Sequence, residues 1–213
     1  MSILVFVDAP KGKIAKAAYE AVYYGKQIAD KRSTTVTVLT YGDVADSDLA
    51  ELGNYGATKV LVNKSIKEDN DEQLTALGAA AVEKEGAKVI IFSFDPLGKS
   101  LAPRLSARLE AGLVTGATAL PEMDGDNFVV TKSVFSGKAF SKNAIKTDIK
   151  IISLMPNSIK AEKGGNTAQV ETFEPAVAEG KIKVKELKMD SGDGIPLPEA
   201  ELVVSAGRGL KAL

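Results

Sequence analysis

The sequence of 213 residues contains no cysteine and no histidine. Without cysteine the chain cannot form a disulfide and offers no thiolate ligand to a metal ion. Without histidine it lacks the most frequent general base, the usual partner of a nucleophilic serine and the commonest metal ligand. These two absences argue against a hydrolase triad, and we predict that the chain carries no catalytic residues and no metal site.

A surplus of charge of either sign is also missing. The chain has 27 Lys and Arg residues against 28 Asp and Glu residues, so nothing in its net charge favours nucleic acid or an anionic membrane as a partner. No apolar run approaches the ~20 residues that span a bilayer, and the opening segment lacks the basic region of a signal peptide. We expect no nucleic-acid partner, no membrane insertion and a cytoplasmic location, unless a targeting segment was removed ahead of residue 1.

The stretch at residues 89–120 organises the chain. Its first part, 89–94, is a continuous apolar run, too short for a membrane span and too apolar for a half-exposed strand, so we predict a central strand covered on both faces. A turn, an amphipathic segment and a second apolar run follow. In open parallel sheets ligands lie at the carboxyl ends of strands, which makes residues 95–100 the place to expect chemistry.

The loop at residues 95–100 resembles a phosphate-binding loop only in part. The tripeptide Gly-Lys-Ser at 98–100 follows a strand and opens a helix, but the motif also needs a glycine where this chain has Ser93. Pro96 removes one of the N–H groups that would surround a phosphate. The simpler interpretation is that Gly98 makes a turn, that Lys99 or Ser100 starts the helix, and that Pro103 lies in its first turn.

Strand-like and helix-like segments alternate through residue 120. This alternation predicts a parallel sheet with helices on both faces and right-handed crossovers, a three-layer α/β fold. Small apolar residues line one face of the first predicted helix, which suits close packing on a sheet. The predicted helices cover residues 13–30, 46–52 and 70–85. The predicted parallel strands cover residues 3–7, 34–40, 59–63, 89–94, 117–120 and 150–155.

The pattern changes after residue 120. Residues 128–135 and 138–145 are predicted to form an antiparallel pair around a Ser-Gly turn, as an extension of the sheet edge. Residues 170–173 and 182–187 alternate in polarity and are predicted to be surface strands or an arm. The segment 190–198, DSGDGIPLP, has the composition of a linker. We therefore predict an α/β domain with a C-terminal arm over residues 1–188, followed by a linker and the start of a second domain over residues 189–213.

The C-terminal segment allows two interpretations. An apolar run at 202–205 precedes Gly207, Arg208 and Gly209, as in the opening of a nucleotide-binding βα unit. Alternatively, the run adds an edge strand to the first domain and the glycines fray. If the run is the start of a second domain, we expect residues after about 188 to be mobile in this chain, because a single strand needs partners.

Five segments together resemble the alpha subunit of electron transfer flavoproteins. They are SILVFVD at 2–8, GATKVLV at 56–62, GKSLAPRLSARLEAGLVTGATAL at 98–120, SGKAFS at 136–141 and AGRGLKAL at 206–213. They occur in the order of the family across nearly the whole chain. The chain departs from the family pattern at Ala206, where glycine is usual, at Asp8-Ala9, which replaces an acidic residue and histidine, and at Gly116-Ala117, which replaces an acidic step.

The resemblance implies a function in electron transfer. In that family the alpha subunit has an α/β domain, then a second domain that holds most of the FAD, and it pairs with a beta subunit. The resemblance implies that Arg208, with Gly207 and Gly209, lies against the FAD, and that electrons pass from dehydrogenases to a quinone-linked acceptor. The chain would be an electron carrier and not an enzyme, and residues 1–213 alone are not expected to hold FAD.

Two other hypotheses remain open from the sequence. One is a small α/β module of the stress-protein type that binds AMP or ATP through residues 8–13 and 95–100. The other is a pure interaction domain, with residues 101–120 as one candidate surface for the beta subunit.

Overall fold

The computed structural model describes residues 2–9, 12–67, 69–125, 127–178, 180–182, 197, 200, 202–207 and 209. The chain divides into two compact units, Met1–Lys183 and Val184–Leu213. Within the described ranges, no helix is both long and apolar enough to cross a membrane.

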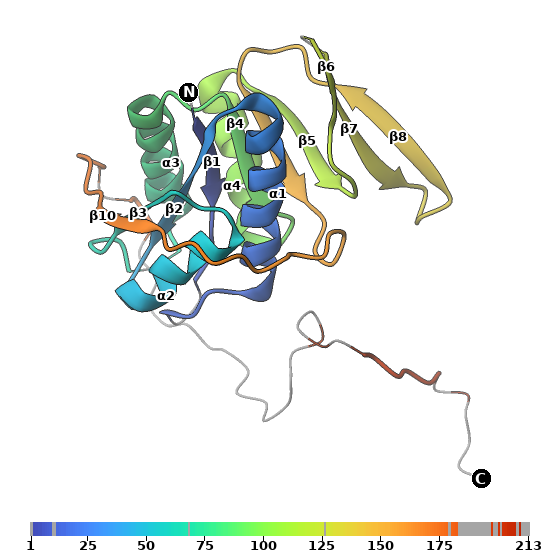
Figure 1. Cartoon of the computed structure of the whole chain (residues 1–213), viewed down its shortest axis with the longest axis horizontal. Coiled ribbons are helices and arrows are strands. Elements are labelled where there is room, and N and C mark those ends of the chain that lie inside the picture. Colours follow the sequence, from blue (N-terminus) through green and yellow to red (C-terminus); the bar gives the residue numbers. More distant parts are fainter. Residues whose placement is uncertain are drawn as a thin grey trace. The chain divides into compact units, whose positions relative to one another are not determined.

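The first unit is a three-layer α/β structure with one mixed sheet between helices (Figure 1). Over the described residues the sheet has ten strands, in the order β10-β3-β2-β1-β4-β9-β5-β7-β6, with β8 paired to β7. The pairs from β10 to β5 are parallel, and β7 runs antiparallel to β5, β6 and β8. The parallel strands are β1 (Ser2–Phe6), β2 (Thr35–Tyr41), β3 (Lys59–Asn63), β4 (Val89–Ser93), β5 (Gly112–Ala117), β9 (Lys150–Leu154) and β10 (Gln169–Thr172). The antiparallel extension consists of β6 (Glu122–Asp124), β7 (Asn127–Val134) and β8 (Ala139–Ala144).

The helices cover both faces of the parallel strands (Figure 1). They are α1 (Lys16–Arg32), α2 (Asp46–Glu51), the 3-10 turn η2 (Leu52–Tyr55), α3 (Asp71–Glu85) and α4 (Pro96–Leu109). The first three pack into one apolar cluster, and α3 and α4 pack into the other. Local sequence sets the ends of α3: the Asn70 side chain accepts hydrogen bonds from two N–H groups of the first turn, and Gly86 ends the helix with a φ of 59°.

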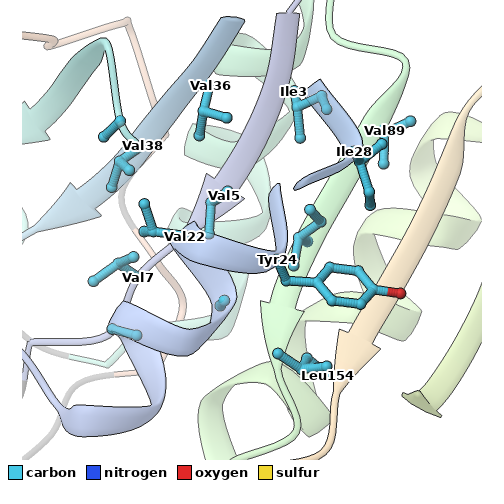
Figure 2. Close-up of a cluster of buried hydrophobic side chains, with 14 of the residues drawn as sticks. Ile3, Val5, Val7, Val22, Tyr24, Ile28, Val36, Val38, Val89 and Leu154 are labelled. Carbon is cyan, nitrogen blue, oxygen red and sulfur yellow. The ribbon is translucent and has the colours of Figure 1, made fainter. Parts of the chain in front are cut away.

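Strand β1 separates the two cores. Alternate residues of β1 point into opposite clusters, and all five are buried, as expected for a central parallel strand. Figure 2 shows the cluster beneath α1, where Val5 and Val22 face each other across the gap between strand and helix. A β carbon at Gly25 of α1 would lie 3.0 Å from the Val5 side chain, so the small residues of this helix allow its close approach.

The structure confirms the predicted fold class and most of the predicted elements. The prediction of a strand at 117–120 is wrong, because β5 occupies Gly112–Ala117. Helix α4 ends at Leu109 and the next residue, Glu110, has a φ of 51°, so the chain turns early enough for the strand to start at Gly112. Gly116, with a φ of 74°, forms a bulge in β5, and this glycine obscured the strand pattern in the sequence.

The interpretation of the start of α4 is also corrected. The helix begins at Pro96 and not at Lys99 or Ser100, because the Asp95 side chain caps it. Pro103 therefore lies inside the helix, where its missing N–H leaves the carbonyl of Lys99 without its usual helical donor.

One predicted surface segment belongs to the sheet. Residues 170–173 largely coincide with β10, which adds a parallel strand beside β3. Residues 183–187 lie outside the described residues. In the second unit Leu202, Val203 and Val204 form no strand, and Leu202 and Val204 are 84% and 89% exposed.

Candidate functional site

The carboxyl edge of the sheet is the first place to look for a site, because β1 and β4 form a topological switch point there. The chain leaves β1 toward β2 on one side, while β4 pairs with β1 on the other side. In open α/β sheets the crevice at such a point is where nucleotides bind. This edge would hold AMP or ATP if the chain were a nucleotide-binding module.

Three carboxylates gather at this edge, and we call Asp8, Asp69 and Asp95 the acidic cluster. Tyr41, at the end of β2, donates its hydroxyl to Asp69 Oδ1 at 2.5 Å and lies 3.5 Å from Asp8 Oδ1. Burial first, and then the charges of Asp95 and Asp69, raise the pKa of Asp8 to about 6. Burial and the hydrogen bond to Asp69 raise the pKa of Tyr41, so its hydroxyl stays protonated.

The amino end of α4 points at the same edge, but a side chain already occupies it. Asp95 Oδ1 accepts the N–H of Gly98 at 2.7 Å, so a carboxylate of the protein takes the place a phosphate oxygen would need. Burial raises the pKa of Asp95. A β carbon at Gly98 would lie 1.9 Å from the carbonyl oxygen of Ser93, so this glycine is required by packing against the preceding strand.

This arrangement does not suit a phosphate. Lys99 is the basic residue beside Asp95, and its ammonium lies 4.5 Å from the centre of the Phe94 ring. Lys99 is exposed and acts on Asp95, and the end of α4 at this edge is already capped by that carboxylate. Among the described residues there is also no group of three or more His, Cys, Asp or Glu side chains that could hold a metal ion.

A buried carboxylate on α1 fixes the neighbouring loop. Glu20 is 6% exposed and accepts the N–H of Asn157 at 2.7 Å, and burial raises its pKa. Asn157 has a φ of 61°, so the loop after β9 turns sharply here. The loop places Met155 beside Gly116, next to Phe94. Sequence reasoning missed Glu20, because nothing in a helical pattern indicates that a glutamate faces the core.

The antiparallel extension carries exposed aromatic residues. Phe135 is 80% exposed and Phe140 is 71% exposed, both at the end of the β7–β8 hairpin. By contrast, several large apolar side chains of residues 101–120, the candidate interaction surface from the sequence, are buried, while Leu109, Leu113 and Leu120 are half-buried. Leu101, Leu105 and Ala117 are at most 1% exposed.

The three predicted flavin-contacting residues, Gly207, Arg208 and Gly209, all belong to the second unit. Arg208 lies outside the described residues. Gly207 and Gly209 belong to the second unit and are exposed, and no described atom lies within 4 Å of the position a β carbon would take at either glycine. Their role at a flavin stays a prediction.

Comparison with known proteins gives evidence on function that the geometry alone does not give. The sequence model of the family described as "Electron transfer flavoprotein domain" matches residues 3–178. The chain is 28% identical over 215 residues to electron transfer flavoprotein subunit alpha of Bacillus subtilis (strain 168), an alignment that covers 99% of this chain and 65% of that protein. It is 27% identical over 217 residues to the protein of the same name from Syntrophomonas wolfei, covering 97% of this chain and 65% of that protein.

A third relative has a different name. The chain is 24% identical over 240 residues to acryloyl-CoA reductase electron transfer subunit beta of Anaerotignum propionicum, covering 98% of this chain and 65% of that protein. The chain thus spans slightly less than two thirds of the length of these three relatives.

Proposed function

Because this chain belongs to the electron transfer flavoprotein family, whose domain matches residues 3–178, we propose that it is an alpha subunit, or the amino-terminal part of one, that carries electrons through FAD. The observation that carries the proposal is the family match over nearly the whole first unit. Relatives named as alpha subunits align over almost all of this chain. In this proposal dehydrogenases supply the electrons, a quinone-linked acceptor takes them, and a beta subunit completes the protein.

The first unit acts as a scaffold in this proposal, and the flavin is held elsewhere. FAD carries a pyrophosphate, which needs N–H donors and cations around it. The carboxyl edge instead presents Asp8, Asp69 and Asp95, with Asp95 capping α4. This charge argues against a flavin site at the carboxyl edge, and the assignment of the flavin to Gly207, Arg208 and Gly209 rests on the resemblance to the family. The same charge counts against the alternative of an AMP- or ATP-binding module at residues 8–13 and 95–100.

The chain's own residues then have binding and positioning roles. FAD supplies the redox chemistry when it is bound, so the protein needs no general acid or nucleophile. This role agrees with a sequence that lacks both histidine and cysteine. Arg208 would donate charge-assisted hydrogen bonds to the pyrophosphate or to the edge of the flavin, and Gly207 and Gly209 would let the backbone approach it.

The test is a titration of FAD into residues 1–213 and into a chain as long as the alpha-subunit relatives, each with and without the beta subunit. One charge-assisted hydrogen bond contributes about 1.5–3 kcal/mol, whereas micromolar binding requires about 8 kcal/mol. We therefore expect the longer protein to purify yellow and residues 1–213 to show no binding at micromolar FAD. Sub-micromolar binding by residues 1–213 would place the flavin site in the present chain. It would contradict the proposal that the flavin is held elsewhere.

A further inference from the structure

A hollow of about 760 Å³ opens at the amino edge of the sheet, opposite the acidic cluster. We call it the basic hollow. It is lined by the start of β1 and of β4, by the end of α1 and the residues after it, and by β6 and the turn after it. The lining residues are Ser2, Ile3, Lys31, Arg32, Ser33, Thr34, Lys88, Val89, Met123 and Gly125.

The charge of this lining is positive. Lys31, Arg32 and Lys88 contribute three cations, and no carboxylate is present among the described lining residues. Lys88 forms an ion pair with Asp148, whose side chain is 76% exposed and does not line the hollow. A pair in such an exposed position is weak, so Lys88 can change partner at little cost.

Arg32 is held in place without being neutralised. Its Nε donates to the Met123 sulfur at 3.4 Å, and its guanidinium carbon lies 5.3 Å from the centre of the buried Phe128 ring. A thioether is a weak, uncharged acceptor, and an aromatic face leaves the terminal amino groups of the guanidinium available. No ion pair involves Arg32 within the described part of the chain.

Basic residues near the end of a helix often only offset its dipole. Lys31 fits that explanation, but Arg32 does not. The carbonyl oxygens of Ala29 and Asp30 already accept the N–H groups of Thr34 and Ser33, at 3.1 and 3.5 Å. Arg32 instead extends away from its helix to Met123, 91 positions further along the chain.

We propose that the basic hollow binds a small phosphate monoester. A guanidinium fixed by a ring, with two ammonium groups around the same space, matches a phosphate dianion in charge and in hydrogen-bonding geometry. Met123, which is half-buried, offers apolar contact to an organic group attached to the phosphate, whereas Ile3 and Val89 are each only 2% exposed. The volume lies within the range of about 300–1,000 Å³ that is usual for sites of small molecules.

The test uses inorganic phosphate, phenyl phosphate and phenol as probes of residues 1–213, by calorimetry at low salt and by amide-resolved NMR. Phenyl phosphate should bind saturably, more tightly than inorganic phosphate, and should shift the amides of Ser33 and Gly125. Phenol should not bind. Raising the salt concentration should weaken the binding of both phosphates, because the site is near the surface.

Three charge-removing variants make the test specific. Arg32→Gln and Lys88→Gln should each weaken phenyl phosphate binding by about tenfold or more. Lys64→Gln, which removes an exposed cation paired with Asp46 beyond the end of β3, is the matched control and should bind like the parent chain. Arg32 covers Phe128, so thermal unfolding of Arg32→Gln is measured first. If that variant unfolds, Lys88→Gln, which leaves the Phe128 contact intact, decides the question.

Three results would overturn the proposal. The first is the absence of saturable phenyl phosphate binding at millimolar concentrations. The second is an equal loss of binding in Lys64→Gln and Lys88→Gln. The third is a set of NMR shifts at Asp8 and Asp95 in place of Ser33 and Gly125. None of these results depends on whether FAD binds, so the test is independent of the proposed electron-transfer function.

Discussion

The two edges of the sheet differ in whether their partly buried carboxylates have a cationic partner. At the carboxyl edge Asp8 is largely buried near Asp69 and Asp95, and its pKa rises to about 6. At the amino edge the side chain of Glu85 is 9% exposed, forms an ion pair with Lys59 and accepts a hydrogen bond from Thr37.

The two edges show that a chain with balanced numbers of acidic and basic residues can still distribute its charge unevenly in space. The chain has almost equal numbers of acidic and basic residues, yet the topology collects carboxylates at one edge and cations in the basic hollow. In this fold the carboxyl edge is the usual place for phosphates, and here it is the less suitable of the two. Substitutions at each edge test this difference in charge.

The largest effect is expected from Gly98→Ala. The added β carbon would lie 1.9 Å from the Ser93 carbonyl oxygen, and neither backbone segment can move without disturbing β4 or α4. We expect the free energy of unfolding to fall by about 3 kcal/mol, as measured by urea denaturation. Gly165→Ala is the control, because no atom lies within 4 Å of its β carbon position. Equal stability of the two variants would mean that Gly98 is not fixed by packing and is open to a ligand.

The next effect concerns the compensated charge at the amino edge. Lys59→Gln leaves the buried Glu85 with Thr37 as its remaining hydrogen-bond partner. We expect a loss of about 2 kcal/mol in the free energy of unfolding. The double variant Lys59→Gln with Glu85→Gln should recover part of it, because no unpaired charge remains. If the double variant is no more stable than the single one, the two edges do not differ in the way proposed.

Asp8→Asn tests the uncompensated charge at the carboxyl edge, and its effect should depend on pH. The folded-state pKa of about 6 lies above the ordinary value of 3.8, so the folded protein binds this proton more tightly than the unfolded chain does. The stability linked to this group is therefore present below about pH 4 and is lost as the pH rises through about 6.

The Asp8→Asn substitution replaces the carboxylate by an uncharged amide and so removes this pH-dependent loss of stability. We expect Asp8→Asn to raise the free energy of unfolding by about 1–3 kcal/mol at pH 7.5 and to change it little at pH 4, as measured by urea denaturation at both values. Asp30→Asn, which alters an exposed carboxylate of α1, is the control and should show no comparable gain. A destabilised Asp8→Asn protein at pH 7.5 would contradict the account of a strained acidic cluster.

The smallest effect is expected away from both edges. Lys142→Gln removes an ion pair with Glu122 on the antiparallel extension, in which both side chains are at least 60% exposed. We expect a change of less than about 0.5 kcal/mol in the free energy of unfolding. A loss as large as that of Lys59→Gln would show that exposure does not distinguish the charges of this protein.

The sequence predicts the parts of the fold that depend on local patterns. Strand β4 follows from its apolar run, and α3 follows from Asn70 and Gly86 at its two ends. The bounds of β5 did not follow, because a bulge at Gly116 interrupts the pattern and shifts the register against β9. The place of β10 did not follow either, since its pairing with β3 joins segments separated by more than a hundred positions.

The sites were harder to predict for a related reason. Asp8, Tyr41, Asp69 and Asp95 lie in four separate segments and meet only because β1, β2 and β4 are neighbours in the sheet. Arg32 and Met123 meet only because α1 ends beside the antiparallel extension. Charge counted along the sequence shows neither the acidic cluster nor the contact between Arg32 and Met123. Both arise because the topology brings distant segments together.

The most direct test of the account is an amide-resolved titration of FAD into isotope-labelled residues 1–213. The carboxyl edge, with its capped α4 and acidic cluster, does not suit a flavin. We expect the amides of Ser93, Asp95 and Gly98 to keep their positions throughout the micromolar range of FAD. Saturable shifts of these three amides with a dissociation constant below about 1 μM, equivalent to more than about 8 kcal/mol of binding free energy, would contradict this expectation.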